Sequence, residues 1–114
     1  MSDARRRLGA RGEAAAAAWY AARGYELLDR NWRCSAGEID LVLRKGATVV
    51  VCEVKTRSTL GYGAPAEAVT AAKRRRLRRL AARWLALHQV HAANVRFDVA
   101  SVLAGQVEVL TAAW

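Results

Sequence analysis

Residues 37–55 read GEIDLVLRKGATVVVCEVK, a stretch that predicts two strands joined by a short loop. Side chains alternate between the two faces of a strand, so Asp40 and Glu53 are expected to share one face of this hairpin. The apolar residues predicted to take the opposite face are Ile39, Leu41, Leu43, Val50, Cys52 and Val54. Burial of that apolar face requires a loop with an even number of residues, because an odd loop would separate the two halves of the set.

The length of this loop decides how the two carboxylates meet. A loop over residues 45–48 pairs Arg44 with Val49 and places Asp40 directly across from Glu53, with Cβ atoms about 5 Å apart. A tighter two-residue loop is expected to leave the carboxylates diagonal to each other but still on one face. Two ionised carboxylates this close repel each other, so one of them binds a proton unless a cation intervenes.

The cation predicted for this face is Mg²⁺ or Mn²⁺, because hard ions take oxygen ligands and keep water positions that a phosphate can share. Lys55 lies on the same face, where its ammonium group would orient an attacking water or offset charge on the phosphate. The alternative is a solvated Glu-Lys pair on an exposed strand. Val42, Val49 and Val51 share this face, which favours a covered face.

Length and composition narrow the class of protein. The chain has 114 residues, of which 54% are hydrophobic and one is proline. This predicts one domain over residues 1–114 and excludes a predominantly disordered chain. No apolar run approaches the roughly 20 residues that span a bilayer, and the N-terminus lacks the apolar stretch of a signal peptide. We therefore expect a cytoplasmic protein with no membrane partner, in which Cys52 is a buried thiol.

Basic residues are in excess and gather on two predicted helices. Nineteen Lys and Arg against ten Asp and Glu give a formal charge of +9, which suits a polyanionic partner. The clusters are Arg5, Arg6, Arg7 and Arg11 on the first helix, and Lys73, Arg74, Arg75, Arg76, Arg78, Arg79 and Arg83 on the second. Such clusters contact several phosphates without reading sequence. A solubilising charged face is the alternative, but the nearby predicted metal site favours nucleic acid.

The remaining pattern predicts an α/β (α+β) fold in the order α-β-β-β-α-β-β, with helices packed on a mixed sheet. The first helix covers residues 4–23 and stops at Gly24. Strands are expected at 25–31, 38–44 and 48–55, followed by a loop over 56–64 that contains Tyr62. Thr70 is the predicted N-cap of a second helix that reaches about His88. Residues 95–103 and 107–111 form a final hairpin.

Several motifs along the chain carry a resemblance to a known family. They are LGARGE at 8–13, GY at 24–25, RNWR at 30–33, GEID at 37–40, EVKTR at 53–57, EAV at 67–69 and RFDV at 96–99. With these motifs the chain resembles the YraN family of small bacterial proteins, a branch of the PD-(D/E)xK, restriction-endonuclease-like superfamily that is related to Holliday-junction resolvases. The core order α-β-β-β-α-β of that superfamily is also the order predicted from the pattern.

The resemblance implies a catalytic site. It assigns Asp40 and Glu53 as metal ligands and Lys55 as the catalytic lysine. Glu13 corresponds to an acidic residue that related nucleases supply from the first helix, where it completes the metal site or holds a water in it. The alternative for Glu13 is a salt bridge with Arg11 or a hydrogen bond to one of the ligands.

The resemblance also implies how the substrate is held. Lys73 takes the position from which superfamily members hold a phosphate, with help from a helix N-terminus; the alternative is one more surface lysine. The other residues expected to contact nucleic acid are Arg11, Arg57, Arg74 and Arg75. Asp98 follows the family pattern too, and a buried ion pair with a neighbouring arginine explains it as well as catalysis does. Trp32 and Tyr62, in loop-like context, are candidates for stacking on bases.

The function expected from these residues is a Mg²⁺-dependent (or Mn²⁺-dependent) nuclease that cuts DNA, branched or single-stranded, by attack of a metal-activated water on phosphorus. Two alternatives stay open. One is a non-catalytic nucleic-acid-binding protein of the same fold, and the other is an adaptor that docks its basic second helix on an acidic protein. Because related resolvases are dimers, a homodimer is a further expectation.

Overall fold

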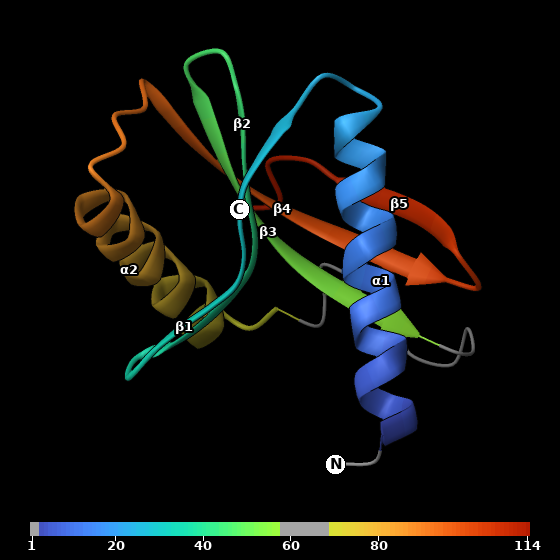
Figure 1. The fold of residues 1–114 in the computed structure, drawn as a ribbon. Coiled ribbons are helices and arrows are strands. Elements are labelled where there is room, and N and C mark those ends of the chain that lie inside the picture. Colours follow the sequence, from blue (N-terminus) through green and yellow to red (C-terminus); the bar gives the residue numbers. More distant parts are fainter. Residues whose placement is uncertain (1–2, 58–68) are drawn as a thin grey trace.

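The computed structural model describes residues 3–57 and 69–114 and contains a five-stranded sheet between two helices (Figure 1). The elements are α1 (Asp3–Ala21), β1 (Glu26–Cys34), β2 (Gly37–Lys45), β3 (Thr48–Arg57), α2 (Ala71–His88), β4 (Asn94–Leu103) and β5 (Gln106–Leu110). The sheet order is β1-β2-β3-β4-β5, with β3 and β4 parallel and the other neighbours antiparallel. The predicted order and mixed sheet are confirmed, and they are consistent with a restriction-endonuclease-like core.

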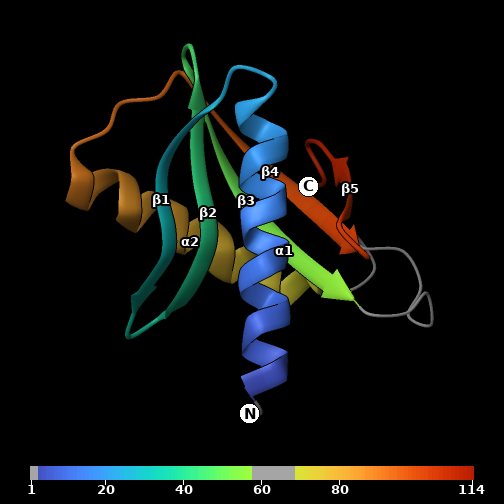
Figure 2. The same ribbon diagram turned by 45° about the vertical axis from the view of Figure 1, so that its right-hand side comes forward.

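The two helices cover opposite faces of the sheet, with α1 in front and α2 behind in Figure 2. The buried side chains on the α1 face are Ala16, Tyr20, Leu41, Leu43, Val50, Cys52, Ala100 and Val102. Those on the α2 face include Ile39, Val42, Val49, Val51, Leu77, Leu80, Trp84, Phe97 and Val99. Because β3 is covered on both sides, it is apolar at every position from Val49 to Cys52. Cys52 is a buried free thiol, as predicted, and burial raises its pKa to about 12.

The β2–β3 hairpin has the register that the apolar pattern predicts. Arg44 pairs with Val49, and Lys45 pairs with Thr48 across a turn that leaves only residues 46 and 47 unpaired. This is the register predicted for the loop over residues 45–48, and the β2–β3 pairs end at Leu41 and Cys52, one position before Asp40 and Glu53. Pairing the two outermost residues of a four-residue loop shortens the loop without shifting the register.

The predicted alternation of residues 39–43 is wrong at Ile39. Ile39 packs on the α2 face, whereas Leu41 packs on the α1 face. The β2–β3 pairs run only from Lys45 to Leu41, so the first part of β2 is paired with β1 alone. Asn31, beside this point in β1, has φ of 53°, a left-handed conformation that Asn tolerates better than most residues. The β1–β2 ribbon turns here, and the turn carries Ile39 to the other face.

Element ends agree with the predictions to within a few residues. Thr70 caps α2 as predicted, since its Oγ1 accepts a hydrogen bond from the backbone N–H of Lys73 at 3.2 Å. The loop expected from residue 56 is wrong at its start, because β3 continues through Arg57. Tyr62 and the rest of that loop lie outside the described residues. Neither described helix is long and apolar enough to cross a bilayer.

Trp32 does not have the loop-like context expected of it. It lies in β1 and packs against the core beneath α2, with its ring 6.4 Å from that of His88 in an edge-on arrangement. His88 in turn stacks on Trp84 at 4.2 Å. The indole therefore helps to hold β1 against α2.

Candidate metal and nucleic-acid site

Asp40 lies where β2 turns away from β3. Its Oδ2 accepts a hydrogen bond from the backbone N–H of Val54 at 2.8 Å, which ties the two strands together just beyond their last pair. Burial, followed by the negative charge of Glu53, raises the pKa of Asp40 to about 8. A carboxyl group that holds its proton this firmly can give it up when a cation supplies the missing countercharge.

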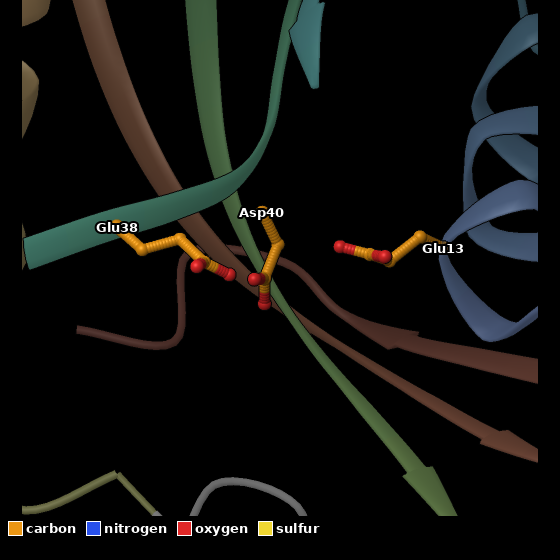
Figure 3. Close-up of side chains that lie close together, drawn as sticks. All are labelled: Glu13, Glu38 and Asp40. Carbon is orange, nitrogen blue, oxygen red and sulfur yellow. The ribbon is translucent and has the colours of Figure 1, made fainter. Parts of the chain in front are cut away.

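Two further carboxylates converge on Asp40. Ligand oxygens of Glu13, Glu38 and Asp40 all lie within 4.8 Å of one another, and Figure 3 shows Glu13 of α1 pointing across toward the pair on β2. We call these three residues the acid group. Burial raises the pKa of Glu13. Glu38 also forms an ion pair with Arg33, whose Nε lies 2.7 Å from Glu38 Oε2.

Sequence reasoning missed Glu38 although a signal was present. Residues two apart in a strand point to the same face, so Glu38 could be expected beside Asp40. The motif GEID was interpreted through its aspartate alone. The structure instead brings both acidic residues of that motif to the same place.

Close packing of α1 against β3 positions Glu13. Gly12 is buried, and a Cβ added to it would collide with the side chain of Thr56, including Thr56 Cβ at 2.8 Å. Only glycine permits this approach of the helix to the strand. A second tie comes from Arg30 of β1, whose Nη2 donates a hydrogen bond to the carbonyl oxygen of Ala10 at 3.0 Å.

Glu53 is held by two lysines. Its Oε1 lies 2.6 Å from Lys73 Nζ and 3.4 Å from Lys55 Nζ, and the residue is only 7% exposed. Burial lowers the pKa of Lys55. Burial also acts to lower the pKa of Lys73, but the hydrogen bond and the negative charge of Glu53, together with smaller contributions from Lys55 and Asp40, outweigh burial in sum and raise the pKa. Glu53 is thus adjacent to the acid group, with its charge already compensated by ammonium groups.

Two clefts meet at the acid group. The larger, of about 670 Å³, lies on the α1 side, and among the residues that line it are Arg5, Arg6, Glu13, Glu38, Asp40 and Lys55. The smaller, of about 220 Å³, lies on the α2 side and is lined by Glu38, Asp40, Glu53, Lys73 and Arg76 together with apolar residues. Glu38 and Asp40 line both clefts, so the acid group is accessible from two directions.

Comparison with known proteins places the chain in a family. Residues 12–102 match the family model described as "Uncharacterised protein family UPF0102". The chain belongs to the UPF0102 family. A UPF0102 protein of Beutenbergia cavernae is 59% identical over 96 residues, which cover 84% of this chain and 81% of the relative. A UPF0102 protein of Rhodococcus opacus is 51% identical over 98 residues, which cover 86% and 83% of the two chains.

Membership confirms the recognition made from the motifs, because UPF0102 is the YraN-like branch of the PD-(D/E)xK nuclease-like superfamily. A UPF0102 protein of a Nocardioides species is likewise 56% identical over 96 residues, covering 84% of this chain and 77% of the relative. The range matched by the UPF0102 model contains every residue of the acid group as well as both lysines that contact Glu53.

Most of the arginines predicted to contact nucleic acid lie away from the acid group of this UPF0102 protein. Arg74 donates a hydrogen bond from Nε to the carbonyl oxygen of Val69 at 3.1 Å. Arg75 is exposed and lines neither cleft. Arg11 and Arg57 line a separate cleft of about 410 Å³, between α1 and the turn that joins β4 to β5. Of the predicted set, only Lys73 reaches the carboxylates.

Asp98 has a structural role that its surroundings explain fully. It is 0% exposed and accepts hydrogen bonds from Arg96 Nε at 2.9 Å and from the Tyr20 hydroxyl at 2.6 Å. The backbone N–H of Ala112 donates a further bond at 3.0 Å. The buried ion pair is therefore the alternative that fits Asp98, and it fastens α1 and the C-terminal segment to β4.

Proposed function

We propose that this UPF0102 protein is a Mg²⁺- or Mn²⁺-dependent nuclease that hydrolyses phosphodiester bonds in DNA. The observation that carries the proposal is the convergence of Glu13, Glu38 and Asp40 within 4.8 Å of one another, in a cleft that also contains Lys55. Carboxylate oxygens are the ligands that these hard divalent ions take in proteins. The donor set therefore fits one such ion.

Each residue of the site has a role in this proposal. The acid group holds the ion, and Glu53 offers a further carboxylate on the opposite side of Asp40. When bound, the ion supplies charge stabilisation to the phosphate and acidifies a coordinated water. Lys55 lies in the same cleft, where its ammonium group offsets the negative charge that develops on phosphorus. Its lowered pKa makes it more ready than an ordinary lysine to exchange a proton with water.

Charge around the clefts supports a nucleic acid as the substrate. The chain carries a formal charge of +9, and arginines border the acid group on both sides: Arg5, Arg6 and Arg33 on the larger cleft and Arg76 on the smaller. A polyanion approaches such a surface although the carboxylates of the site are themselves negative, because these four arginines together with Lys55 and Lys73 outnumber the four carboxylates Glu13, Glu38, Asp40 and Glu53.

The proposal is tested by cleavage assays with linear, flap and four-way DNA and with RNA of the same sequences, in Mg²⁺, Mn²⁺ or EDTA. Asp40→Asn and Lys55→Met are expected to abolish cleavage. Glu108→Gln removes an exposed carboxylate on β5 and is expected to leave cleavage unchanged. Undiminished cleavage by Asp40→Asn would contradict the proposal. Binding of nucleic acid without cleavage by the wild-type protein would support a non-catalytic binding protein instead.

A further inference from the structure

A further cleft along α2 adjoins the smaller of the two clefts that meet at the acid group. It has a volume of about 280 Å³ and is lined by Ala36, Arg76, Arg79, Leu80 and Arg83. Arg76 and Leu80 also line the smaller cleft at the acid group, so the two clefts adjoin. We call the combined channel the α2 groove. Its polar lining runs from the acid group to the middle of α2 through Glu53, Lys73, Arg76, Arg79 and Arg83.

The tip of the β1–β2 hairpin forms the opposite wall of this groove, because Ala36 lines it and Gly37 packs against Leu80 and Arg76 of α2. Gly37, with φ of 145°, packs so closely that an added Cβ would lie 3.2 Å from Leu80 Cδ1 and 3.4 Å from Arg76 Cδ. A side chain at this position would have to displace the side chain of Leu80 or Arg76 by a few tenths of an ångström. The packing of Gly37 on these two side chains therefore helps to set the width of the groove.

The arginines along the groove lie on one flank of α2. Arg76, Arg79 and Arg83 follow a spacing of three and four residues, which keeps them on one side of a helix. The other flank is committed to the core, because Arg74 lies over the ring of Trp114 at 5.7 Å and Arg78 over that of Phe97 at 5.4 Å. Only the groove flank presents its arginines to a channel that ends at the carboxylates.

The dimensions of the α2 groove favour one strand over two. Its two adjoining clefts measure about 220 and 280 Å³, which together match a pocket for one drug-sized molecule of roughly 300–1,000 Å³, a scale that suits one or two nucleotides of a single strand better than the body of a duplex. From Arg76 to Arg83 the helix rises about 10 Å. Successive phosphates of one strand lie at least about 3.4 Å apart, so this length spans at most about four phosphates, enough for one at each of the three arginines.

We propose that the α2 groove holds a single strand of nucleic acid and leads it to the acid group. The inference rests on the proposed function and names its substrate class: a nucleic acid with a single-stranded segment beside the bond that is cut. Phosphates of that segment contact Arg76, Arg79 and Arg83, while the wider cleft on the α1 side receives the remainder of the substrate. The sequence-based expectation placed these contacts at Arg74 and Arg75, on other sides of the same helix.

Binding measurements in EDTA test the groove separately from catalysis. The probes are a fluorescein-labelled oligothymidylate and a blunt duplex of the same length, titrated at salt concentrations between about 50 and 200 mM. Arg79→Gln/Arg83→Gln is expected to weaken oligothymidylate binding roughly tenfold and to reduce the slope of log K against log salt by about 1.4, which corresponds to two lost phosphate contacts on a single strand. Duplex binding is expected to change little.

The matched control is Arg7→Gln/Arg75→Gln, which makes the same change of charge at exposed positions outside the described clefts. It is expected to weaken oligothymidylate binding much less than the groove variant does. The proposal that the α2 groove binds a single strand would be overturned if both double variants lost the same affinity for oligothymidylate. It would also be overturned if Arg79→Gln/Arg83→Gln weakened binding of the duplex more than binding of oligothymidylate. Calorimetric titration with Mg²⁺ separates the two proposals. If the protein binds oligothymidylate selectively but binds no Mg²⁺, the proposed nuclease activity is contradicted. If it binds Mg²⁺ but Arg79→Gln/Arg83→Gln does not weaken oligothymidylate binding, only the proposed role of the α2 groove is contradicted.

Discussion

Lys73 Nζ lies 2.6 Å from Glu53 Oε1, and this contact fastens the first turn of α2 to β3 beside the acid group. The same carboxylate oxygen is 3.4 Å from Lys55 Nζ, so a single oxygen serves two ammonium groups. An ion pair of this kind opposes the binding of a metal, because a divalent cation beside Asp40 must compete with Lys73 for Glu53. The lysine therefore lowers the affinity of the site that it helps to hold together.

Replacing Lys73 by Met is expected to raise the affinity for Mn²⁺ by roughly threefold to tenfold, the scale of one partly exposed ion pair. The free energy of unfolding in EDTA should fall by about 1 kcal/mol, because the tie between α2 and β3 is lost. Calorimetric titration and urea denaturation measure the two effects. Arg75→Met removes one positive charge from the exposed side of the same helix and controls for net charge. An equal rise in affinity in both variants would contradict competition for Glu53.

The raised pKa of Asp40 predicts an unusual pH dependence of stability without metal. The folded carboxyl has a pKa of about 8 against about 3.9 in an unfolded chain, so the folded state binds the proton more tightly. This contribution is complete below about pH 4 and is lost as the pH rises through 8. The free energy of unfolding in EDTA should fall by roughly 3–4 kcal/mol between pH 5 and pH 8.

Asp40→Asn is the control for this titration, because an amide keeps an oxygen to accept the hydrogen bond from Val54 and carries no charge. The difference between the wild type and this variant in urea denaturation isolates Asp40 from other groups that titrate. Saturating Mg²⁺ should reverse the wild-type trend, since the ion binds the ionised carboxylate. A pH profile of the variant that parallels the wild type would count against a perturbed Asp40.

Gly12→Ala is expected to move α1 away from β3 and to displace Glu13 from the acid group. The new Cβ meets Thr56 Cβ at 2.8 Å, an atom that no side-chain rotation can move away. Overpacking of this kind costs about 1–3 kcal/mol, and Mn²⁺ affinity should fall with it. Gly9→Ala is the matched control in the same helix, because its Cβ meets no described atom within 4 Å. That variant should stabilise α1 by up to about 1 kcal/mol.

Asp98→Ala is expected to cost about 3 kcal/mol, because it leaves the buried hydroxyl of Tyr20 and the partly exposed Arg96 without their shared carboxylate. Tyr20→Phe removes one hydrogen bond to the same carboxylate and should cost about 1 kcal/mol. Urea denaturation measures both. Since this network lies apart from the acid group, Tyr20→Phe should bind Mn²⁺ as the wild type does. If Tyr20→Phe folds but binds Mn²⁺ more weakly than the wild type, Asp98 contributes to metal binding after all.

Much of the fold follows from local pattern. Apolar spacing and the capping threonine at Thr70 predict the order of elements and the start of α2, and parity predicts the pairing of Arg44 with Val49. The predicted face of Ile39 was wrong because side chains alternate between the two faces of a sheet only while the strand is regular. The β1–β2 ribbon turns beside Asn31, whose backbone is left-handed, and the periodicity of the sequence does not predict this turn.

The sequence predicted several residues of the site but not how these residues are arranged in space. The motif residues Asp40, Glu53 and Lys55 lie close together, yet the carboxylates that gather with Asp40 within 4.8 Å of one another are Glu13 and Glu38. Which arginines face the carboxylates depends on where Gly37 packs on α2. That contact joins segments distant in sequence, so helical spacing alone could not select Arg76 over Arg75.

The left-handed residue Asn31 lies in β1 opposite the segment of β2 that carries Glu38, Asp40 and Gly37. We expect a substitution that straightens the ribbon at this point to shift both the acid group and the packing of Gly37 on α2. The proposed affinity for a cation and the proposed preference for a single strand would then change together, so neither could be altered alone by a substitution at this turn.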